Sequence, residues 1–170
     1  FRGADLSKSN IIATALFGDG AAAGIVETSD AGHRISASGE YCWPNSLDVM
    51  GWRIEDDGLG VQFSRDIPQL VRTELRGAAD RFLSGAGIPF NAIDHFVFHP
   101  GGAKVLTALE EAFEIAAPGL TVGRSILRDF GNMSAATVLF VLKRILEQPI
   151  SGRSLLGALG PGFTAGFAVM

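Results

Sequence analysis

The stretch AIDHFVFHPGGAKVL, residues 92–106, passes from a strand pattern to a helix pattern through His99, Pro100, Gly101 and Gly102. Its first half is aromatic and β-branched, which predicts a short strand. Its second half starts a helical apolar spacing at Val105. A chain that alternates strands and helices in this way is expected to bury a sheet under helices in a layered α/β domain.

The remaining segments extend this pattern. Helical spacing predicts helices after a cap at Asp66 with Pro68 in the first turn, along 105–113, 125–130 and 135–146. The apolar run 10–28 around Gly18-Asp19-Gly20 predicts two strands, or a strand and a bulge. Strands are also expected within 40–64, at 92–99, and on both sides of a Gly-Pro-Gly turn near the end. Because the strands are apolar on both faces, we expect a mixed sheet covered by helices on both sides.

Composition excludes several classes of protein. The 170 residues are 47% hydrophobic, which suits one domain with a substantial core. A net charge of −4 with no Lys/Arg cluster argues against nucleic acid as a partner, and no apolar run reaches the ~18 residues of a membrane span. The single cysteine, Cys42, allows no internal disulfide and favours a reducing, cytoplasmic location. The chain starts at Phe1 with neither an initiator methionine nor a signal peptide, so we expect part of a longer protein.

His99 is the first candidate for chemistry. It stands where a strand ends and a helix begins, and ligands of open α/β sheets bind at the carboxyl ends of strands. Gly101 and Gly102 would let the backbone approach a ligand closely. The pattern alone also permits a buried, hydrogen-bonded histidine in a glycine turn, and this alternative stays open.

Metal and nucleotide sites have weaker support. His95 and His99 would lie about 13 Å apart along a strand, too far to share an ion with bonds near 2 Å. The run Glu55-Asp56-Asp57 is typical of a solvated turn. The glycines at 18, 20 and 24 only loosely imitate a dinucleotide fingerprint, and the absence of a G-x-S-x-G motif disfavours an ordinary serine hydrolase.

Asn132 and Cys42 have two interpretations each. Asn132 stands between two helical stretches, where it would cap the second helix or direct its amide, a donor of two hydrogen bonds, at an oxyanion. Cys42, in EYCWPN, has no helix N-terminus or neighbouring cation to lower its pKa. We therefore interpret it as a structural residue or a pocket wall rather than a nucleophile.

Five segments in one order resemble a known family. ALFGDGAAAGIV, GLGVQFSRDIP, HPGGAKVL, GNMSAATVLFVL and LGPGFTAGF are similar to the C-terminal half of type III polyketide synthases, the chalcone/stilbene synthase-like members of the thiolase-fold condensing enzymes. The resemblance covers nearly the whole chain. It implies one half of a thiolase-like fold, with residues 1–170 as the C-terminal domain and the half that bears the catalytic cysteine absent.

The resemblance assigns roles to particular residues. In this family a cysteine, a histidine and an asparagine act together, and His99 and Asn132 match the last two. Phe1 resembles a gatekeeper phenylalanine of the acyl cavity, and the second gatekeeper would fall near Val61, where a smaller residue implies a roomier passage. Gly51 matches a glycine of the starter pocket. The loop that closes the cavity floor matches Gly160, Pro161, Gly162 and Phe163.

The resemblance also implies an activity. An acyltransferase of this kind would condense malonyl-CoA with loss of CO₂ onto an acyl-CoA starter, as a homodimer and with no metal or redox cofactor. The segments look bacterial, and long fatty acyl-CoA starters giving alkylpyrones or alkylresorcinols are expected. Alternatives are a β-ketoacyl-ACP synthase III-like enzyme, a non-catalytic half-domain that pairs with a partner half, and a nucleotide-binding domain. We expect the isolated 170 residues to be inactive and poorly stable, because they would expose a large apolar face.

Overall fold

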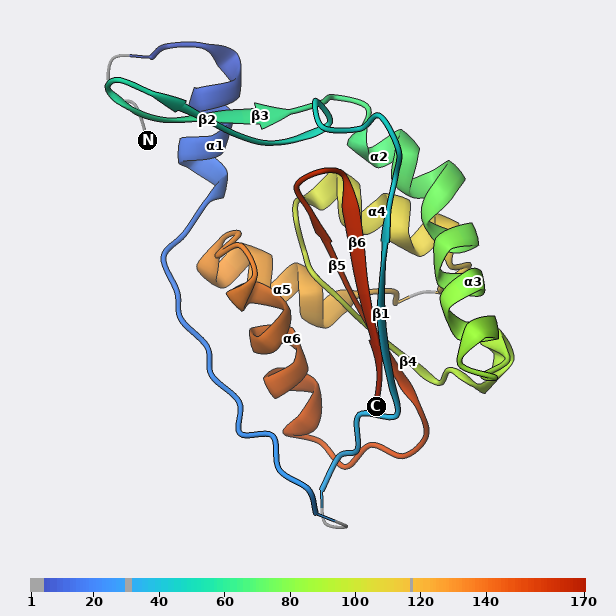
Figure 1. Ribbon diagram of the computed structural model, residues 1–170. Coiled ribbons are helices and arrows are strands. Elements are labelled where there is room, and N and C mark those ends of the chain that lie inside the picture. The colour runs from blue at the N-terminus through green and yellow to red at the C-terminus, as the bar shows by residue number, and fades with distance from the viewer. Residues whose placement is uncertain (1–4, 30–31, 117) are drawn as a thin grey trace.

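The computed structural model describes residues 5–29, 32–116 and 118–170; Phe1 lies outside these ranges. Its centre is a four-stranded mixed sheet in the order β1-β6-β5-β4 (Figure 1). These strands are β1 (Ala37–Cys42), β4 (His95–Phe98), β5 (Ser154–Gly160) and β6 (Thr164–Val169). Strand β4 runs parallel to β5, whereas β6 runs antiparallel to both β5 and β1.

Helices cover both faces of this sheet, as the apolar strands predict. On one face lie α4 (Ala103–Ala112) and a continuous helical segment formed by α2 (Ile67–Leu70), the π-helical turn η1 (Val71–Leu75) and α3 (Arg76–Gly85). On the other face lie α5 (Thr121–Phe130) and α6 (Ala136–Leu146), to the left of the sheet in Figure 1. A single 3₁₀ turn, η2 (Phe90–Ala92), precedes β4.

Two buried clusters follow from the alternation of side chains along the strands. Phe98 and Leu155 belong to the larger cluster, under α3 and α4. Val97 and its neighbour Leu156 pack in the smaller cluster, under α5 and α6. Because successive strand residues point to opposite faces, one short strand such as β4 anchors both helical layers.

A second, two-stranded sheet lies beside the main one. Its strands β2 (Met50–Glu55) and β3 (Gly58–Phe63) form the predicted hairpin and pack with α1 (Lys8–Leu16) (Figure 1). Phe17, which follows α1, stacks on Phe63 with ring centroids 5.9 Å apart and lies 6.2 Å from Trp52. This aromatic contact joins the N-terminal segment to the hairpin.

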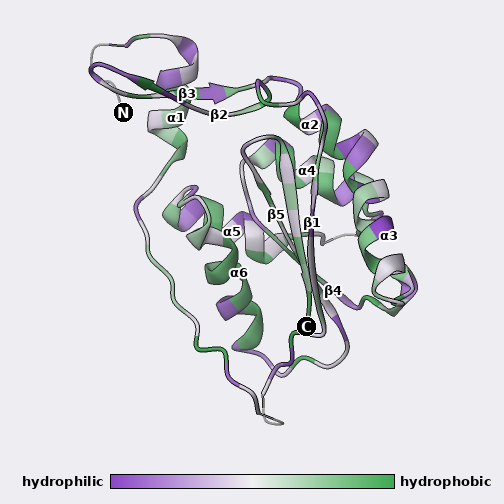
Figure 2. Cartoon of the chain, in the orientation of Figure 1, coloured by the Kyte–Doolittle hydropathy of each residue, from purple (hydrophilic) through white to green (hydrophobic). Residues whose placement is uncertain are grey.

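The prediction of two strands in residues 10–28 is wrong. Residues 8–16 form α1, whose first turn is capped by Ser7: its side chain accepts a hydrogen bond from the Asn10 backbone. Asn10 and Ala13 are the buried residues of this helix, and their spacing of three is helical. Residues 18–29 are extended but pair with no strand among the described residues, and Figure 2 shows apolar residues along this segment. Ile25 is 95% exposed.

Several helix and turn predictions are confirmed, with shifts at the ends. The helix after Asp66 ends at Gly85, and Gly87 then adopts a φ of +69°. The helix expected at 125–130 begins at Thr121. Gly160 to Thr164 form the turn between β5 and β6. No helix among the described residues is long and apolar enough to cross a membrane.

Candidate active site

His99 stands directly after β4 and is held from its backbone. Its N–H donates to the Gly157 oxygen on β5 at 2.8 Å, and its own carbonyl accepts from the Gly101 N–H at 3.0 Å. The second bond closes a tight turn over Pro100 and delivers the chain to α4. The sheet therefore places the imidazole at the carboxyl end of a parallel strand pair, where ligands bind in α/β folds.

The His99 side chain is half-buried among apolar neighbours. Beside it is a small recess lined by Leu75, Phe98, Leu109 and residues 157–159 and 167. Burial lowers the pKa of His99 from 6.5 to about 4, because the imidazolium would lose its hydration. At neutral pH His99 is therefore an uncharged imidazole within this chain.

The two ring nitrogens of His99 differ. Nδ1 is enclosed and has no hydrogen-bond partner among the described residues. An enclosed N–H without an acceptor is rarer in proteins than an acceptor without a donor, so we assign the proton to Nε2. A neutral His99 then presents an Nε2–H donor, and the lone pair remains on the buried side.

Asn132 is brought to the same turn from the loop between α5 and α6. Its side chain is buried, with 6% exposed, and Nδ2 donates to the Gly101 oxygen at 3.1 Å. Its Oδ1 accepts from the Ser134 N–H at 2.9 Å. Because a backbone N–H can only donate, this contact fixes which end of the amide is oxygen. One Nδ2 hydrogen is bonded to Gly101, and the hydrogen bonds of the described residues leave the other for a ligand.

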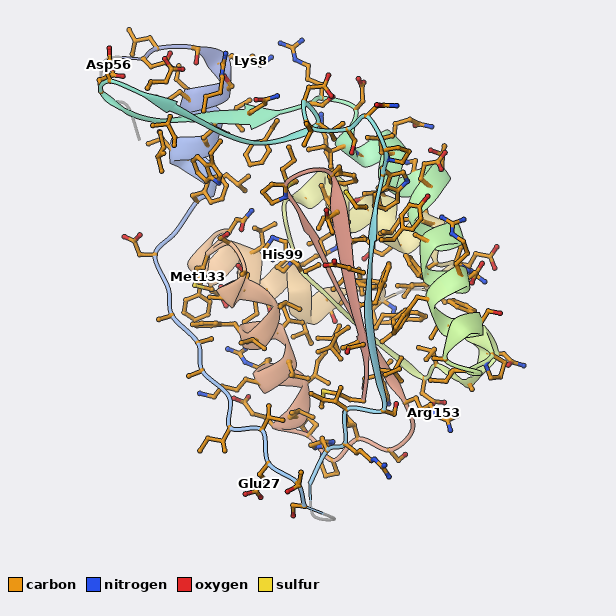
Figure 3. All side chains as sticks on the ribbon, in the orientation of Figure 1. Lys8, Glu27, Asp56, His99, Met133 and Arg153 are labelled. Atoms are coloured by element: carbon orange, nitrogen blue, oxygen red, sulfur yellow. The ribbon has the colours of Figure 1, made fainter. Side chains whose placement is uncertain are left out.

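The loop that carries Asn132 has its own supports, which the sequence interpretation missed. Ser134 adopts a left-handed φ of 57°, which is uncommon for a residue other than glycine and marks a tight turn directly before α6. Thr137, fully buried, accepts from the Met133 N–H and donates to the Ser134 oxygen, both at 2.8 Å. Asn132 is not the N-cap of α6; that position is Ala135. Figure 3 labels His99 near the end of the sheet and Met133 beside the α5/α6 pair.

The Gly160–Phe163 loop lies further along β5 from the strand position that holds His99. Gly160 follows Gly157 by three residues, about 10 Å along a strand. Ser46, a buried residue that the sequence interpretation missed, holds this loop. Its Oγ lies 2.8 Å from the Gly162 oxygen and accepts from the Phe163 N–H at 2.6 Å. The Gly162 N–H donates to the Met50 oxygen at 3.3 Å, which ties the loop to the start of β2.

Gly51 and Val61 lie in the β2–β3 hairpin. Val61 pairs with Trp52 and is 7% exposed, and Gly51 pairs with Gln62. Phe63 lies two residues beyond Val61, on the same face of β3, and the sequence interpretation passed over it. The nearest atom to a methyl group placed on Gly51 would be the Leu47 oxygen at 3.9 Å, so this position has room.

The remaining candidate residues lie away from the His99 turn. Cys42 is exposed at the end of β1, with Sγ 3.9 Å from the Gly162 oxygen, so it borders the loop rather than His99. The Nε2 atom of His95 lies 2.9 Å from the Ser151 oxygen, away from the His99 turn. Among the described residues no three His, Cys, Asp or Glu side chains gather closely enough to hold a metal ion.

Comparison with known proteins shows which family the chain is similar to. Residues 34–169 match the family model of chalcone and stilbene synthases, C-terminal domain. The chain is 40% identical to a putative chalcone synthase of Bacillus subtilis (strain 168) over 97% of its length, and 38% identical to 1,3,6,8-tetrahydroxynaphthalene synthase of Streptomyces peucetius subsp. caesius over 98%. It covers 48% and 46% of these relatives, so it spans about half their length.

A solved structure is also similar to this chain. The crystal structure of 1,3,6,8-tetrahydroxynaphthalene synthase from Streptomyces coelicolor A3(2), a bacterial type III polyketide synthase, matches with a TM-score of 0.89 at 27% identity. The match covers 98% of this chain and 49% of that one. The expected thiolase-like fold of one half-enzyme is thus confirmed. The chain belongs to the chalcone and stilbene synthase family.

Proposed function

We propose that this chain supplies the histidine and asparagine of a type III polyketide synthase that condenses malonyl-CoA onto an acyl-CoA starter. The observation that carries the proposal is the meeting of His99 and Asn132 at one turn, where Asn132 Nδ2 is bonded to the Gly101 oxygen. Two neutral N–H donors there suit a site that stabilises a developing oxyanion. The half of the protein that precedes this chain in its relatives would bring the catalytic cysteine.

The chemistry begins with the cysteine. Its thiolate attacks the starter thioester carbonyl, the bond to the CoA sulfur breaks, and CoA leaves as a thiol with the proton of the His99 imidazolium, which becomes neutral again. A thiolate beside His99 would favour the imidazolium and raise its pKa from the value that burial alone sets. The ion pair keeps the sulfur nucleophilic at neutral pH.

Extension follows at the same place. Malonyl-CoA loses CO₂ when its carboxylate carbon–carbon bond breaks, and the electron pair forms an enolate with charge on the thioester oxygen. His99 Nε2–H and the second Asn132 Nδ2–H would donate to this oxygen. The enolate carbon then attacks the cysteine-bound acyl carbonyl, and the cysteine sulfur leaves. One oxyanion donor is typically worth about 10²–10³ in rate.

Two product classes are candidates. Val61 in place of a larger aromatic residue favours a long aliphatic starter and alkylpyrone or alkylresorcinol products. The similarity to 1,3,6,8-tetrahydroxynaphthalene synthases favours a tetrahydroxynaphthalene product instead. Incubating the complete encoded protein with malonyl-CoA, with and without a fatty acyl-CoA, and identifying the products by mass spectrometry separates them.

The same assay tests the activity itself. The complete protein should incorporate labelled malonyl-CoA, and His99→Ala and Asn132→Ala should each reduce incorporation to background. Incorporation that survives both substitutions would contradict the proposal. We also propose that the working protein acts in the cytoplasm as a homodimer without a metal or redox cofactor.

A further inference from the structure

The backbone of residues 16–18 lies along Asn132 and is bonded to it at both ends. The Asn132 N–H donates to the Leu16 oxygen at 2.9 Å, and the Gly18 N–H donates to the Asn132 oxygen at 3.1 Å. Phe17 and Asn132 thus form an isolated parallel bridge outside any strand. Both backbone polar groups of Asn132 are satisfied by a segment that the structure otherwise leaves outside the main sheet.

This contact is too close for side chains at two glycines. A Cβ on Gly18 would lie 2.1 Å from the Phe130 oxygen. A Cβ on Gly131 would lie 2.8 Å from the Leu16 oxygen, and its φ of +73° already favours glycine. In both cases the obstacle is backbone, which cannot swing away as a side chain can. An alanine at either position must separate the two segments.

Gly20, two residues after Gly18, is less constrained than Gly18 and Gly131. A Cβ on Gly20 would lie 2.2 Å from the sulfur of Met133, the residue after Asn132. The methionine side chain is flexible, so it can yield part of the space. We therefore expect an alanine to be excluded at Gly18 and Gly131 but partly tolerated at Gly20.

The contact is connected to the candidate active site by short steps. Gly18 holds the backbone of Asn132, and the Asn132 side chain holds the Gly101 oxygen in the turn that begins at His99. The Ser134 N–H fixes the amide orientation, so a shift of the Asn132 backbone must move Nδ2. A displacement of about 1 Å in a catalytic group can cost on the order of 10² in rate.

We infer that Gly18 is a positioning residue for the Asn132 amide, and that the Leu16–Gly18 segment sets where the oxyanion donor stands. This inference rests on the proposed function. It explains the glycines in ALFGDG by close backbone packing rather than by nucleotide binding. It predicts a defect in the step that uses Asn132 rather than in starter loading, because Gly18 reaches the His99 turn only through the Asn132 side chain, whereas the His99 backbone is itself held by Gly157 on β5.

The test separates two steps in the complete encoded protein. We expect Gly18→Ala to lower kcat for malonyl-CoA decarboxylation by roughly 10- to 100-fold, with KM within about twofold, since binding is not its role. Loading of the starter, measured as the burst of free CoA in a single turnover, should stay at the wild-type rate. Gly85→Ala is the matched control, because a Cβ there meets no atom within 4 Å and α3 ends at that residue.

The outcomes distinguish a positioning role of Gly18 from a merely structural one. Loss of loading and decarboxylation to the same extent would overturn the inference, since a merely structural glycine would impair both steps. Decarboxylation at the wild-type rate by the Gly18→Ala protein would also overturn the inference. If Gly18→Ala does not fold, Gly20→Ala should show a smaller fall in decarboxylation alone; an unchanged or unselective effect there would equally overturn it. A wild-type protein that releases no CO₂ would instead remove the proposed function, and with it this role of Gly18.

Discussion

Asn132 donates a hydrogen bond of 3.1 Å from its side-chain Nδ2 to the backbone oxygen of Gly101, the second residue after His99. The two residues that the family resemblance selects are thus connected through one turn, although they lie on different loops. The bond uses one amide hydrogen and leaves the other for a ligand. The arrangement is what an oxyanion site needs before its substrate arrives, because preorganised donors pay no reorganisation cost during the reaction.

Acid should destabilise the 170-residue chain through His99. Burial lowers the His99 pKa from 6.5 to about 4, so the unfolded chain binds a proton at a higher pH than the folded chain. The stabilising effect of the neutral ring is complete above pH 6.5 and is lost as the pH falls towards 4. The total loss should be at most about 3 kcal/mol.

Urea unfolding between these two pH values measures this effect. His99→Gln should remove that part of the pH dependence, whereas the same change at the exposed His33 should leave it intact. An identical pH dependence in the wild type and His99→Gln would show that another group is responsible.

Ser46 should be important for stability although it belongs to no motif. Ser46→Ala removes the acceptor of the buried Phe163 N–H and the contact to the Gly162 oxygen. An unsatisfied buried donor costs about 1–3 kcal/mol. The urea midpoint should fall accordingly. Ser36→Ala removes one hydrogen bond of 3.2 Å at an exposed residue and is the control; it should lower the urea midpoint less. Equal effects would contradict the role given to Ser46.

Val61 should influence starter length. In the complete protein, Val61→Phe places a bulky ring on a buried β3 position whose partner is Trp52. We expect long acyl-CoA starters to lose kcat/KM by about tenfold or more, and short ones to lose less, since overpacking is costly where space is already filled. Ile54→Phe, at a residue that is 91% exposed near the turn of the same hairpin, is the control. Equal losses for all chain lengths would exclude Val61 from the starter passage.

Exposed apolar side chains should make the isolated chain associate. Ile25 and Val26 are 95% and 81% exposed in a segment without a sheet partner among the described residues. Sedimentation should show concentration-dependent association of the 170-residue chain, reduced by Ile25→Lys with Val26→Lys. The same double substitution at the exposed Glu27 and Ser29 should leave association unchanged. A wild-type chain that stays monomeric at high concentration would contradict the expected instability of the isolated half.

Local pattern predicted much of this fold, and long-range contact explains what it missed. The helix that ends at Gly85 and the final hairpin have periodicity and turn residues within a few positions, so sequence was enough. Residues 10–28 were misassigned because their apolar run has no clear period, and the Ser7 cap of α1 was not recognised. The family motifs selected His99 and Asn132. Ser46 was missed because the two contacts by which it holds the loop, to Gly162 and Phe163, are more than a hundred residues away, and no local pattern reveals them.

The Asn132 contact with Leu16 and Gly18 is a similar case. In the sequence, Gly18-Asp19-Gly20 resembles only a poor nucleotide fingerprint, because the role of a glycine is inferred there from its neighbours along the chain. The structure shows that the constraint at Gly18 comes from the Phe130 oxygen, on a different element. A glycine required by a distant backbone has no signature in one sequence.

The central claim is that Asn132 donates to the enolate oxygen formed from malonyl-CoA. Its most direct test is the single-turnover rate of CO₂ release from malonyl-CoA by the complete encoded protein carrying Asn132→Ala, with Asn91→Ala at an exposed site as the control. The account predicts a fall of about 10²–10³ for Asn132→Ala and none for Asn91→Ala. CO₂ release near the wild-type rate in Asn132→Ala would contradict it.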